Sequence, residues 1–267
     1  MLQKSLKKNA FYNFIRSFMN LAFPIISFPY ASRILMPDGI GKINFANSVI
    51  DYLVMLAGLG ITSYAAREAA KIRDDPFKLN KFSREILLIN GVSTIIAYIF
   101  FAVSLLCVPK FQDYRILLIV CSSKILFITM GLEWLYAVEE EYRYITLRSA
   151  FFQIVSLAFL FIFVRSKNDY VAYAIMGIIS NAGMNVCNIV YARKFINVFE
   201  KTTLEIKKHI KSISIFFGMV CAVKIHSAMD TVMLGFMMND SAVGYYTAAN
   251  KIRRLVVQMI TAITGTL

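Results

Sequence analysis

The chain has 267 residues, of which 58% are hydrophobic and only 17% are charged, yet its net charge is +13. Its mean hydropathy of +0.61 exceeds what a soluble domain of this length needs and indicates several membrane spans. Because the lysines and arginines lie mostly between the apolar runs, as the positive-inside rule requires, a nucleic-acid partner is not expected.

Apolar runs of the length needed to cross a bilayer, about 20 residues, recur along the whole chain. They predict spans at residues 10–35, 42–66, 85–108, 113–138, 147–165, 170–192, 212–238 and 242–267. The expected fold is therefore an all-α, polytopic membrane protein. Pro24 and Pro29 fall inside the first span and predict a kink or local unwinding there.

The first connection, residues 36–41, consists of turn-forming residues, and Asp38 is expected to cap the second helix. That helix then carries a polar stripe at helical spacing. A carboxylate in an apolar helix is costly in hydrocarbon, so we expect the stripe to face protein or water. Its members are Asn44, Asn47, Ser48 and Asp51.

Basic residues are unequally divided between the two ends of the spans, with 18 on the side of the N-terminus and 6 on the other. This predicts a cytoplasmic N-terminus. The connections on the other side are too short for a catalytic domain. The sequence also has no phosphate-binding loop, metal-ligand cluster or nucleophile elbow, so we expect neither an enzyme nor a cofactor.

An internal repeat is suggested by a shift of 203 residues, which places 40–47 over 243–250 with three identities in eight positions. The polar stripe then falls over Thr247, Lys251 and Arg254. Six spans separate the copies, as in transporters built from two six-helix halves. We therefore expect a first lobe at 1–203 and a truncated second lobe at 204–267, with chance similarity between apolar helices as the alternative.

Five basic residues lie inside the predicted spans: Lys124, Lys224, Lys251, Arg253 and Arg254. Each costs about 2.5–3.5 kcal/mol at a helix centre on insertion scales, so they should line water or meet anions. Acidic residues within the spans are fewer, namely Asp51, Glu133 and Asp230. A cavity with this basic surplus suits a phosphate or pyrophosphate.

With these residues in view, the chain resembles the Wzx-type flippases of O-antigen and other repeat-unit polysaccharides, within the multidrug/oligosaccharidyl-lipid/polysaccharide superfamily. The resemblance covers nearly the whole chain and is most specific in the first 70 residues. It departs from the family at Met36-Pro37, where Gly-Pro is usual. The motifs that carry it are residues 9–13, 28–35, 38–46 and 58–61 with Tyr64, Arg67 and Glu68, then Asp230, 233–235 and 243–246 with Ala248, Lys251 and Ile252.

The resemblance implies an inner-membrane protein that moves undecaprenyl-pyrophosphate-linked oligosaccharide across the membrane, by alternating access coupled to an ion gradient. Its partners would be the lipid-linked oligosaccharide, membrane lipids, a polysaccharide polymerase and a chain-length regulator. We expect phosphate attraction at Arg33, Lys124, Lys224, Lys251 and Arg254, and ion coupling or helix pairing at Asp51 and Asp230.

Structural roles, without any part in substrate binding, are the alternative for some of these residues. Lys224 and Asp230 equally suit structural pairing across helices, and Arg33 and Arg253 suit snorkelling towards the membrane surface. Two other functions are also open. One is a drug or cation antiporter of the same superfamily, which would need an acidic cavity to bind a cationic substrate. The other is a polytopic polysaccharide polymerase, which would need a large external loop that carries catalytic groups.

Overall fold

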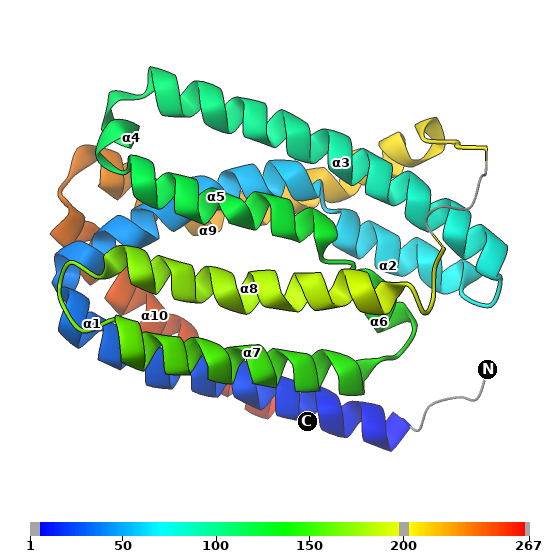
Figure 1. Ribbon diagram of the computed structural model, residues 1–267, viewed down its shortest axis with the longest axis horizontal. Coiled ribbons are helices and arrows are strands. Elements are labelled where there is room, and N and C mark those ends of the chain that lie inside the picture. Colours follow the sequence, from blue (N-terminus) through cyan, green and yellow to red (C-terminus); the bar gives the residue numbers. More distant parts are fainter. Residues whose placement is uncertain (1–5, 198–202, 265–267) are drawn as a thin grey trace.

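The computed structural model describes residues 6–197 and 203–264, and its regular structure over those ranges is entirely helical. This confirms the all-α class. The helices run side by side along the long axis of the molecule (Figure 1). They are α1 (Leu6–Gly58), α2 (Ile61–Ile72), α3 (Pro76–Cys107), α4 (Pro109–Asp113), α5 (Arg115–Met130), α6 (Glu133–Val138), α7 (Tyr142–Phe163), α8 (Tyr170–Ala192), α9 (Lys207–Met237) and α10 (Asp240–Thr264).

α1 is a helical hairpin whose two arms meet at Met36. Met36 has φ 58° and ψ 174°, which reverses the chain between the arms. The connection expected at residues 36–41 is thus reduced to Met36, because residues 37–41 already belong to the second helical arm. Asp38, expected as a helix cap, instead accepts a hydrogen bond from the Ser241 hydroxyl at the start of α10.

Of the two outcomes expected at Pro24 and Pro29, local unwinding is wrong, and a kink stays a prediction. Met36 is the residue of α1 with non-helical dihedral angles, and the first arm passes through both prolines as a helix. The fixed φ of proline is close to the helical value, so each proline removes one backbone hydrogen bond without forcing the helix to unwind.

The fourth predicted span, 113–138, is also not continuous. α5 ends at Met130, and α6 starts at Glu133 after Leu132, whose φ is 41°. The break allows Trp134, Leu135 and Tyr136 to be buried in the core at this end of the bundle. Packing of these large side chains, rather than the apolar run itself, decides where the helix stops.

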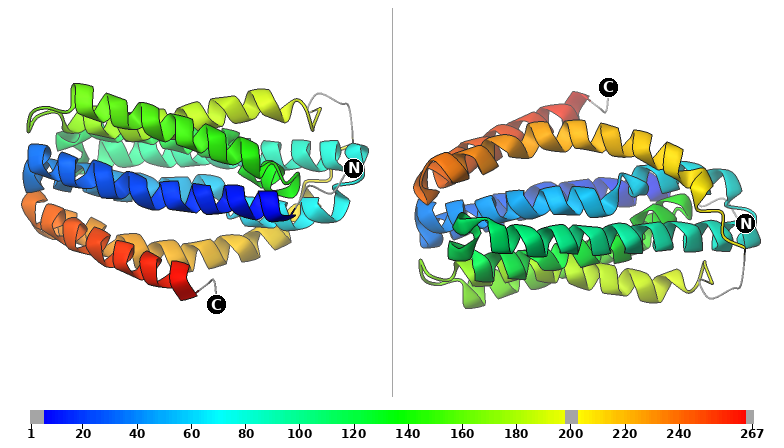
Figure 2. Two further views of the ribbon diagram at one scale, coloured as in Figure 1. Left: turned by 90° about the horizontal axis from the view of Figure 1, so that it is seen from below. Right: turned by 90° about the horizontal axis from the view of Figure 1, so that it is seen from above.

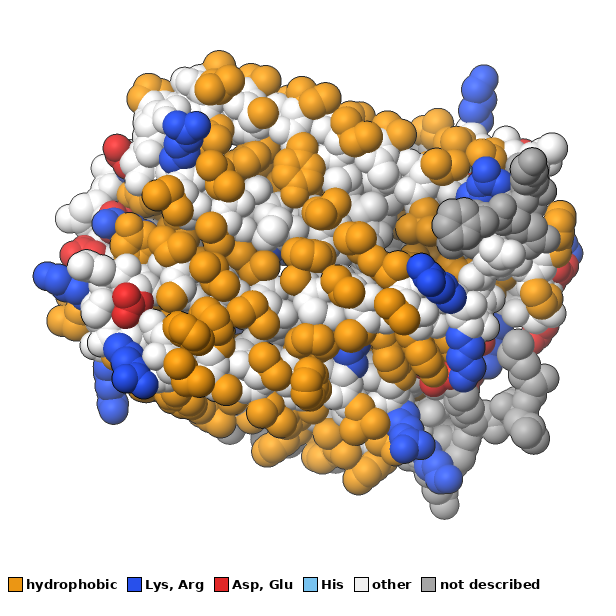
Figure 3. All heavy atoms as spheres, in the orientation of Figure 1, with side chains coloured by type: hydrophobic (Ala, Val, Ile, Leu, Met, Phe, Trp, Pro, Cys, Tyr) orange, Lys and Arg blue, Asp and Glu red, His pale blue; other side chains and the backbone are white. Residues whose placement is uncertain are grey.

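Four described segments are long and apolar enough to cross a membrane: 8–72, 76–107, 142–163 and 170–192. α9 is a fifth if its two parts, bent by 49° between residues 225 and 227, form one span. The first segment contains both arms of α1 and so covers two of the expected spans, but the structure still has fewer unbroken spans than the eight expected. α5 has only 16 residues, and α10 carries three cations near its middle. The polytopic class is nevertheless confirmed, and on the face in Figure 3 hydrophobic side chains cover the middle, with charges at the ends.

α1 lies in the middle of the bundle, with α7 and α8 on one side and α9 and α10 on the other (Figure 2). α1 and α10 meet at one end of the bundle, which we call the hairpin end and define by residues 37–41 and 240–244. A Cβ atom on Gly41 would overlap the Asp240 carbonyl oxygen, and one on Gly244 would overlap the Pro37 carbonyl oxygen. The two backbones are therefore in direct contact.

This contact is reciprocal under the 203-residue shift. The shift carries Pro37 onto Asp240 and Gly41 onto Gly244, so each glycine faces the repeat-equivalent residue of the other helix. Asp38 and Ser241, which are hydrogen-bonded, are equivalent too. Reciprocal contacts of this kind are what two-fold-related copies make. The division into lobes at residue 203 stays a prediction, and residues 198–202 lie outside the described ranges.

Candidate functional site

Between α1, α9 and α10 lies a polar cavity of about 180 Å³, which we call the cationic cavity. The second arm of α1 supplies the polar stripe singled out in the sequence, and α10 supplies the stripe that the repeat placed over it. α9 completes the wall. The lining residues are Asn44, Asn47, Ser48, Asp51, Lys224, Ser227, Ala228, Thr231, Thr247, Asn250, Lys251 and Arg254.

Three cations and one carboxylate line this cavity. Lys224 Nζ lies 4.0 Å from a carboxylate oxygen of Asp51, and both side chains are about two-fifths exposed. Lys251 Nζ lies 4.1 Å from the ring centroid of Phe28, and Arg254 donates to the carbonyl of Ser227 at 3.4 Å. No described carboxylate forms an ion pair with Lys251 or Arg254. The cavity therefore retains a positive surplus.

An apolar cavity of about 250 Å³ adjoins the cationic cavity, because Lys251 and Arg254 line both. Its other lining residues come from the first arm of α1, from α8 and from α10. They are Phe23, Pro24, Ser27, Phe28, Tyr173 and Leu255. The two cations thus lie where a polar and an apolar space meet.

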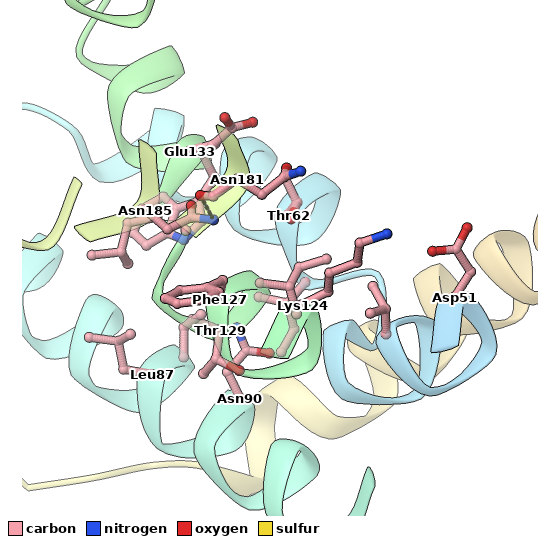
Figure 4. A pocket seen from close by; sticks show the side chains of 17 residues that line it. Asp51, Thr62, Leu87, Asn90, Lys124, Phe127, Thr129, Glu133, Asn181 and Asn185 are labelled. Carbon is pink, nitrogen blue, oxygen red and sulfur yellow. Dashed lines mark hydrogen bonds between the residues drawn. The ribbon is translucent and has the colours of Figure 1, made fainter. Parts of the chain in front are cut away.

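A larger cavity, which we call the amide pocket, has a volume of about 360 Å³ and lies among α1, α2, α3, α5, α6 and α8 (Figure 4). Asp51 lines both this pocket and the cationic cavity. Lys124 lines the amide pocket and donates a hydrogen bond to Asn47 Oδ1 of the cationic cavity. The two spaces are therefore neighbours that share polar groups.

Amides, hydroxyls and aromatic rings line the amide pocket. Its polar side chains include Asn90, Asn181, Asn185, Thr62, Thr129 and Glu133, and its aromatic ones are Phe127 and Trp134. Asn90 is only 8% exposed, and its Oδ1 atom has no partner among the described residues. A buried polar atom without a hydrogen bond is costly and calls for an explanation.

The predicted site residues divide into two groups. Lys224, Lys251, Arg254 and Asp51 come together in the cationic cavity, with Lys124 next to it. Arg33 is exposed and lines neither cavity.

Asp230 also stands apart, because it accepts a hydrogen bond of 2.5 Å from Tyr246 and so links α9 to α10. Lys224 faces Asp51 rather than Asp230. Arg253 donates to Asn250 at 3.1 Å and is not among the residues that line the cationic cavity.

Sequence reasoning missed a buried polar chain at the end of the bundle opposite the hairpin end. Tyr64 Oη lies 2.6 Å from His209 Nδ1, and His209 Nε2 lies 2.7 Å from Glu85 Oε2. Glu85 is fully buried and also accepts from the backbone N–H of Glu205 at 2.7 Å. The carboxylate at the start of an apolar run was the one available signal.

The amide pocket was missed as well, although a signal existed. Asn181 and Asn185 are four residues apart and so share a face of α8, inside an apolar helix. Asn188 continues this polar set and donates to the Gly131 carbonyl at the break between α5 and α6.

Comparison with known proteins agrees with this picture. The family described as "Polysaccharide biosynthesis protein" matches residues 6–267. A protein of Escherichia coli (strain K12) named "Putative O-antigen transporter" is 25% identical over 265 residues, which are 97% of this chain and 63% of that protein. A protein of Shigella dysenteriae with the same name is 24% identical, covering 93% of this chain and 63% of its own length.

The chain therefore spans less than two thirds of the length of both relatives. No solved structure matches it. The family match and the two relatives confirm the resemblance drawn from the sequence motifs.

Proposed function

Because the chain belongs to the polysaccharide biosynthesis protein family, we propose that it serves in a flippase for lipid-linked oligosaccharides. The substrate would be an oligosaccharide repeat unit on undecaprenyl pyrophosphate. It would move from the cytoplasmic to the external leaflet of a bacterial inner membrane. The O-antigen transporter names of the two relatives support this choice of cargo.

The observation that carries the proposal is the cationic cavity. It places Lys224, Lys251 and Arg254 inside an apolar bundle with Asp51 as the one lining carboxylate. Cations in a membrane interior are expensive unless water or an anion meets them. A guanidinium and two ammonium groups are the donors that best suit the oxygens of a pyrophosphate.

The adjoining apolar cavity suits the lipid half of the same substrate. Phe23, Phe28 and Leu255 would contact the first part of a polyprenyl chain, while Lys251 and Arg254 hold its headgroup. A pyrophosphate attached to a lipid tail needs such a junction between a polar and an apolar space.

Separate observations support the remaining features of the proposal. Asp51, which faces Lys224, is the candidate for coupling to an ion gradient, whereas the bond from Tyr246 favours helix pairing for Asp230. The charge distribution of the sequence supports a cytoplasmic N-terminus. A polymerase and a chain-length regulator would be partners on the external side.

The alternative functions fit the cavity less well. A drug or cation antiporter would bring a positive passenger to three cations, which costs energy. A polymerase would need a substantial catalytic loop, and the described connections at the hairpin end, such as that between α9 and α10, are short.

The test is binding of farnesyl pyrophosphate to the purified chain in lipid nanodiscs. Loss of one charged hydrogen-bond donor costs about 1.5–3 kcal/mol, so Lys251→Ala and Arg254→Ala should each raise the Kd at least about tenfold. Arg253→Ala is the matched control, because Arg253 neighbours Arg254 but lies outside the cavity. Its Kd should stay within about twofold of the parent.

The same substitutions, introduced into the chromosomal gene, test transport in the cell. Lys251→Ala and Arg254→Ala should lower surface polysaccharide and accumulate its lipid-linked precursor inside, while Arg253→Ala should not. Equal binding and equal surface polysaccharide in all three strains would contradict the electrostatic mechanism.

A further inference from the structure

We propose that the amide pocket is a sugar-binding subsite that holds the glycan residue attached directly to the pyrophosphate. This inference rests on the proposed function, since it assigns the neighbouring cationic cavity to the pyrophosphate. It assigns a role to the amide and aromatic side chains of the pocket, which are not needed to bind the pyrophosphate.

The pocket offers amide oxygens as hydrogen-bond acceptors. Asn181 and Asn185 donate their amide N–H groups to the carbonyls of Gly177 and Asn181, at 2.8 and 2.9 Å. Their amide nitrogens are thus held by α8 itself, which leaves the amide oxygens as the acceptors offered to the pocket. Asn90 adds a buried amide oxygen that has no described partner. Sugar hydroxyls are donors that would satisfy such oxygens.

The pocket also combines these acceptors with flat apolar surface. Phe127 and Trp134 line it beside the amides. A sugar ring has polar edges and apolar C–H faces, so it needs both kinds of surface. Sites for small molecules combine apolar and aromatic walls with a few placed polar groups, in volumes of about 300–1,000 Å³. The pocket, at about 360 Å³, falls at the small end of that range.

The charges around the pocket do not favour a cation as its occupant. Two carboxylates line the pocket, and both have cationic partners: Glu133 lies 3.1 Å from Arg148 and 3.7 Å from Arg16, and Asp51 lies 4.0 Å from Lys224. Lys124 adds a positive charge to the lining. With Glu133 neutralised and an ammonium group nearby, a neutral hydroxylated ligand fits the pocket better than a metal ion.

The amide pocket lies next to the cationic cavity. Figure 4 shows Asp51 at one side of the pocket, Glu133, Asn181 and Asn185 at another, and Lys124 between them. Asp51 lines both spaces, and a hydrogen bond joins Lys124 of the amide pocket to Asn47 of the cationic cavity. A ligand in one space would therefore lie next to a ligand in the other. The sugar that bears the pyrophosphate is the part of the substrate that this adjacency selects.

The backbone agrees with a binding role. Gly131 and Leu132 line the pocket at the break between α5 and α6. In a membrane protein, irregular backbone is tolerated where it is buried or lines a cavity, and broken helices often mark substrate sites.

The experiment uses the single tryptophan of the chain, Trp134, as a reporter inside the pocket. The purified chain in nanodiscs is titrated with farnesyl pyrophosphate. It is also titrated with four farnesyl pyrophosphate glycosides, bearing glucose, galactose, N-acetylglucosamine or N-acetylgalactosamine. We expect at least one glycoside to bind about tenfold more tightly than farnesyl pyrophosphate and to change the Trp134 emission.

The variants Asn181→Ala and Asn185→Ala should remove the advantage of the glycoside while leaving the Kd for farnesyl pyrophosphate within twofold. Asn168→Ala, in the exposed turn before α8, is the matched control and should change neither Kd. Among the described residues, the side chains of Asn181 and Asn185 donate hydrogen bonds within their own helix, so these variants should fold, and unchanged farnesyl pyrophosphate binding verifies this.

The proposal is overturned if no glycoside binds more tightly than farnesyl pyrophosphate, or if the advantage survives both variants. Failure of the proposed function has a different signature. In that case farnesyl pyrophosphate itself would bind weakly, or its binding would not respond to Lys251→Ala and Arg254→Ala.

Discussion

The two ends of the bundle are held together by different kinds of contact. At the hairpin end, α1 and α10 touch through backbone atoms, because Gly41 and Gly244 have no side chains to separate them. At the other end, α9 meets α2 and α3 through the buried chain of Tyr64, His209 and Glu85. The first contact depends mainly on shape, beside the hydrogen bond from Ser241 to Asp38, and the second depends on hydrogen bonding in a low-dielectric interior.

This difference predicts different sensitivities. A close backbone contact cannot relax around an added methyl group without moving a helix, but it is indifferent to salt and pH. A buried polar chain tolerates small shifts in packing, but it is costly when one member loses its partner. Ion pairs at the surface of the same end should matter least.

The largest effect is expected from Glu85→Ala. Removal of this carboxylate leaves His209 Nε2 and the N–H of Glu205 without their acceptor, and each unsatisfied buried group costs about 1–3 kcal/mol. The free energy of unfolding should fall by about 3 kcal/mol, measured by thermal or denaturant unfolding in detergent. Glu85→Gln keeps an acceptor oxygen and should lose distinctly less. Equal losses in both variants would show that volume rather than hydrogen bonding matters at this position.

A smaller effect, about 1–3 kcal/mol, is expected from Gly244→Ala, because the new Cβ overlaps the Pro37 carbonyl oxygen and α10 must shift. Gly218→Ala on α9 is the control. Its Cβ meets no atom within 4 Å, so higher helix propensity should raise stability slightly. The reciprocal contact predicts that Gly41→Ala matches Gly244→Ala and that the double variant costs less than the sum. Additive losses would argue against a shared contact.

The smallest effect is expected at the exposed pair Lys81–Glu205, whose closest N–O distance is 2.5 Å. The hydrogen bond from Lys81, helped by Lys208, holds the pKa of Glu205 below its usual range. A lowered carboxyl pKa gives a stabilisation that is present above the unfolded-state pKa, about 4.3, and is lost as the pH falls through the folded-state value. Glu205→Gln should therefore lower the Tm slightly at pH 7 and not at pH 3. A loss of Tm as large as that of Glu85→Ala would contradict the comparison.

Much of the architecture could be read from the sequence because local chemistry dictates it. The apolar runs predicted helices, and the turn-forming residues 36–41 predicted a connection where the structure reverses the chain at Met36. The cost of a buried carboxylate predicted that the Asp51 stripe faces inward, and the repeat predicted the stripe on α10 that faces it.

Tertiary structure alone decided which polar groups meet. Helical periodicity tells which face of a helix is polar but not which helix lies opposite, so the partner of Lys224 and the isolation of Arg33 were not foreseeable. The break at Leu132 is set by the burial of the aromatic side chains that follow it. The apolar character of the sequence alone does not predict such a break. The amide pocket has the same origin, because Asn90 and Asn181 lie on different helices and form one site only through packing.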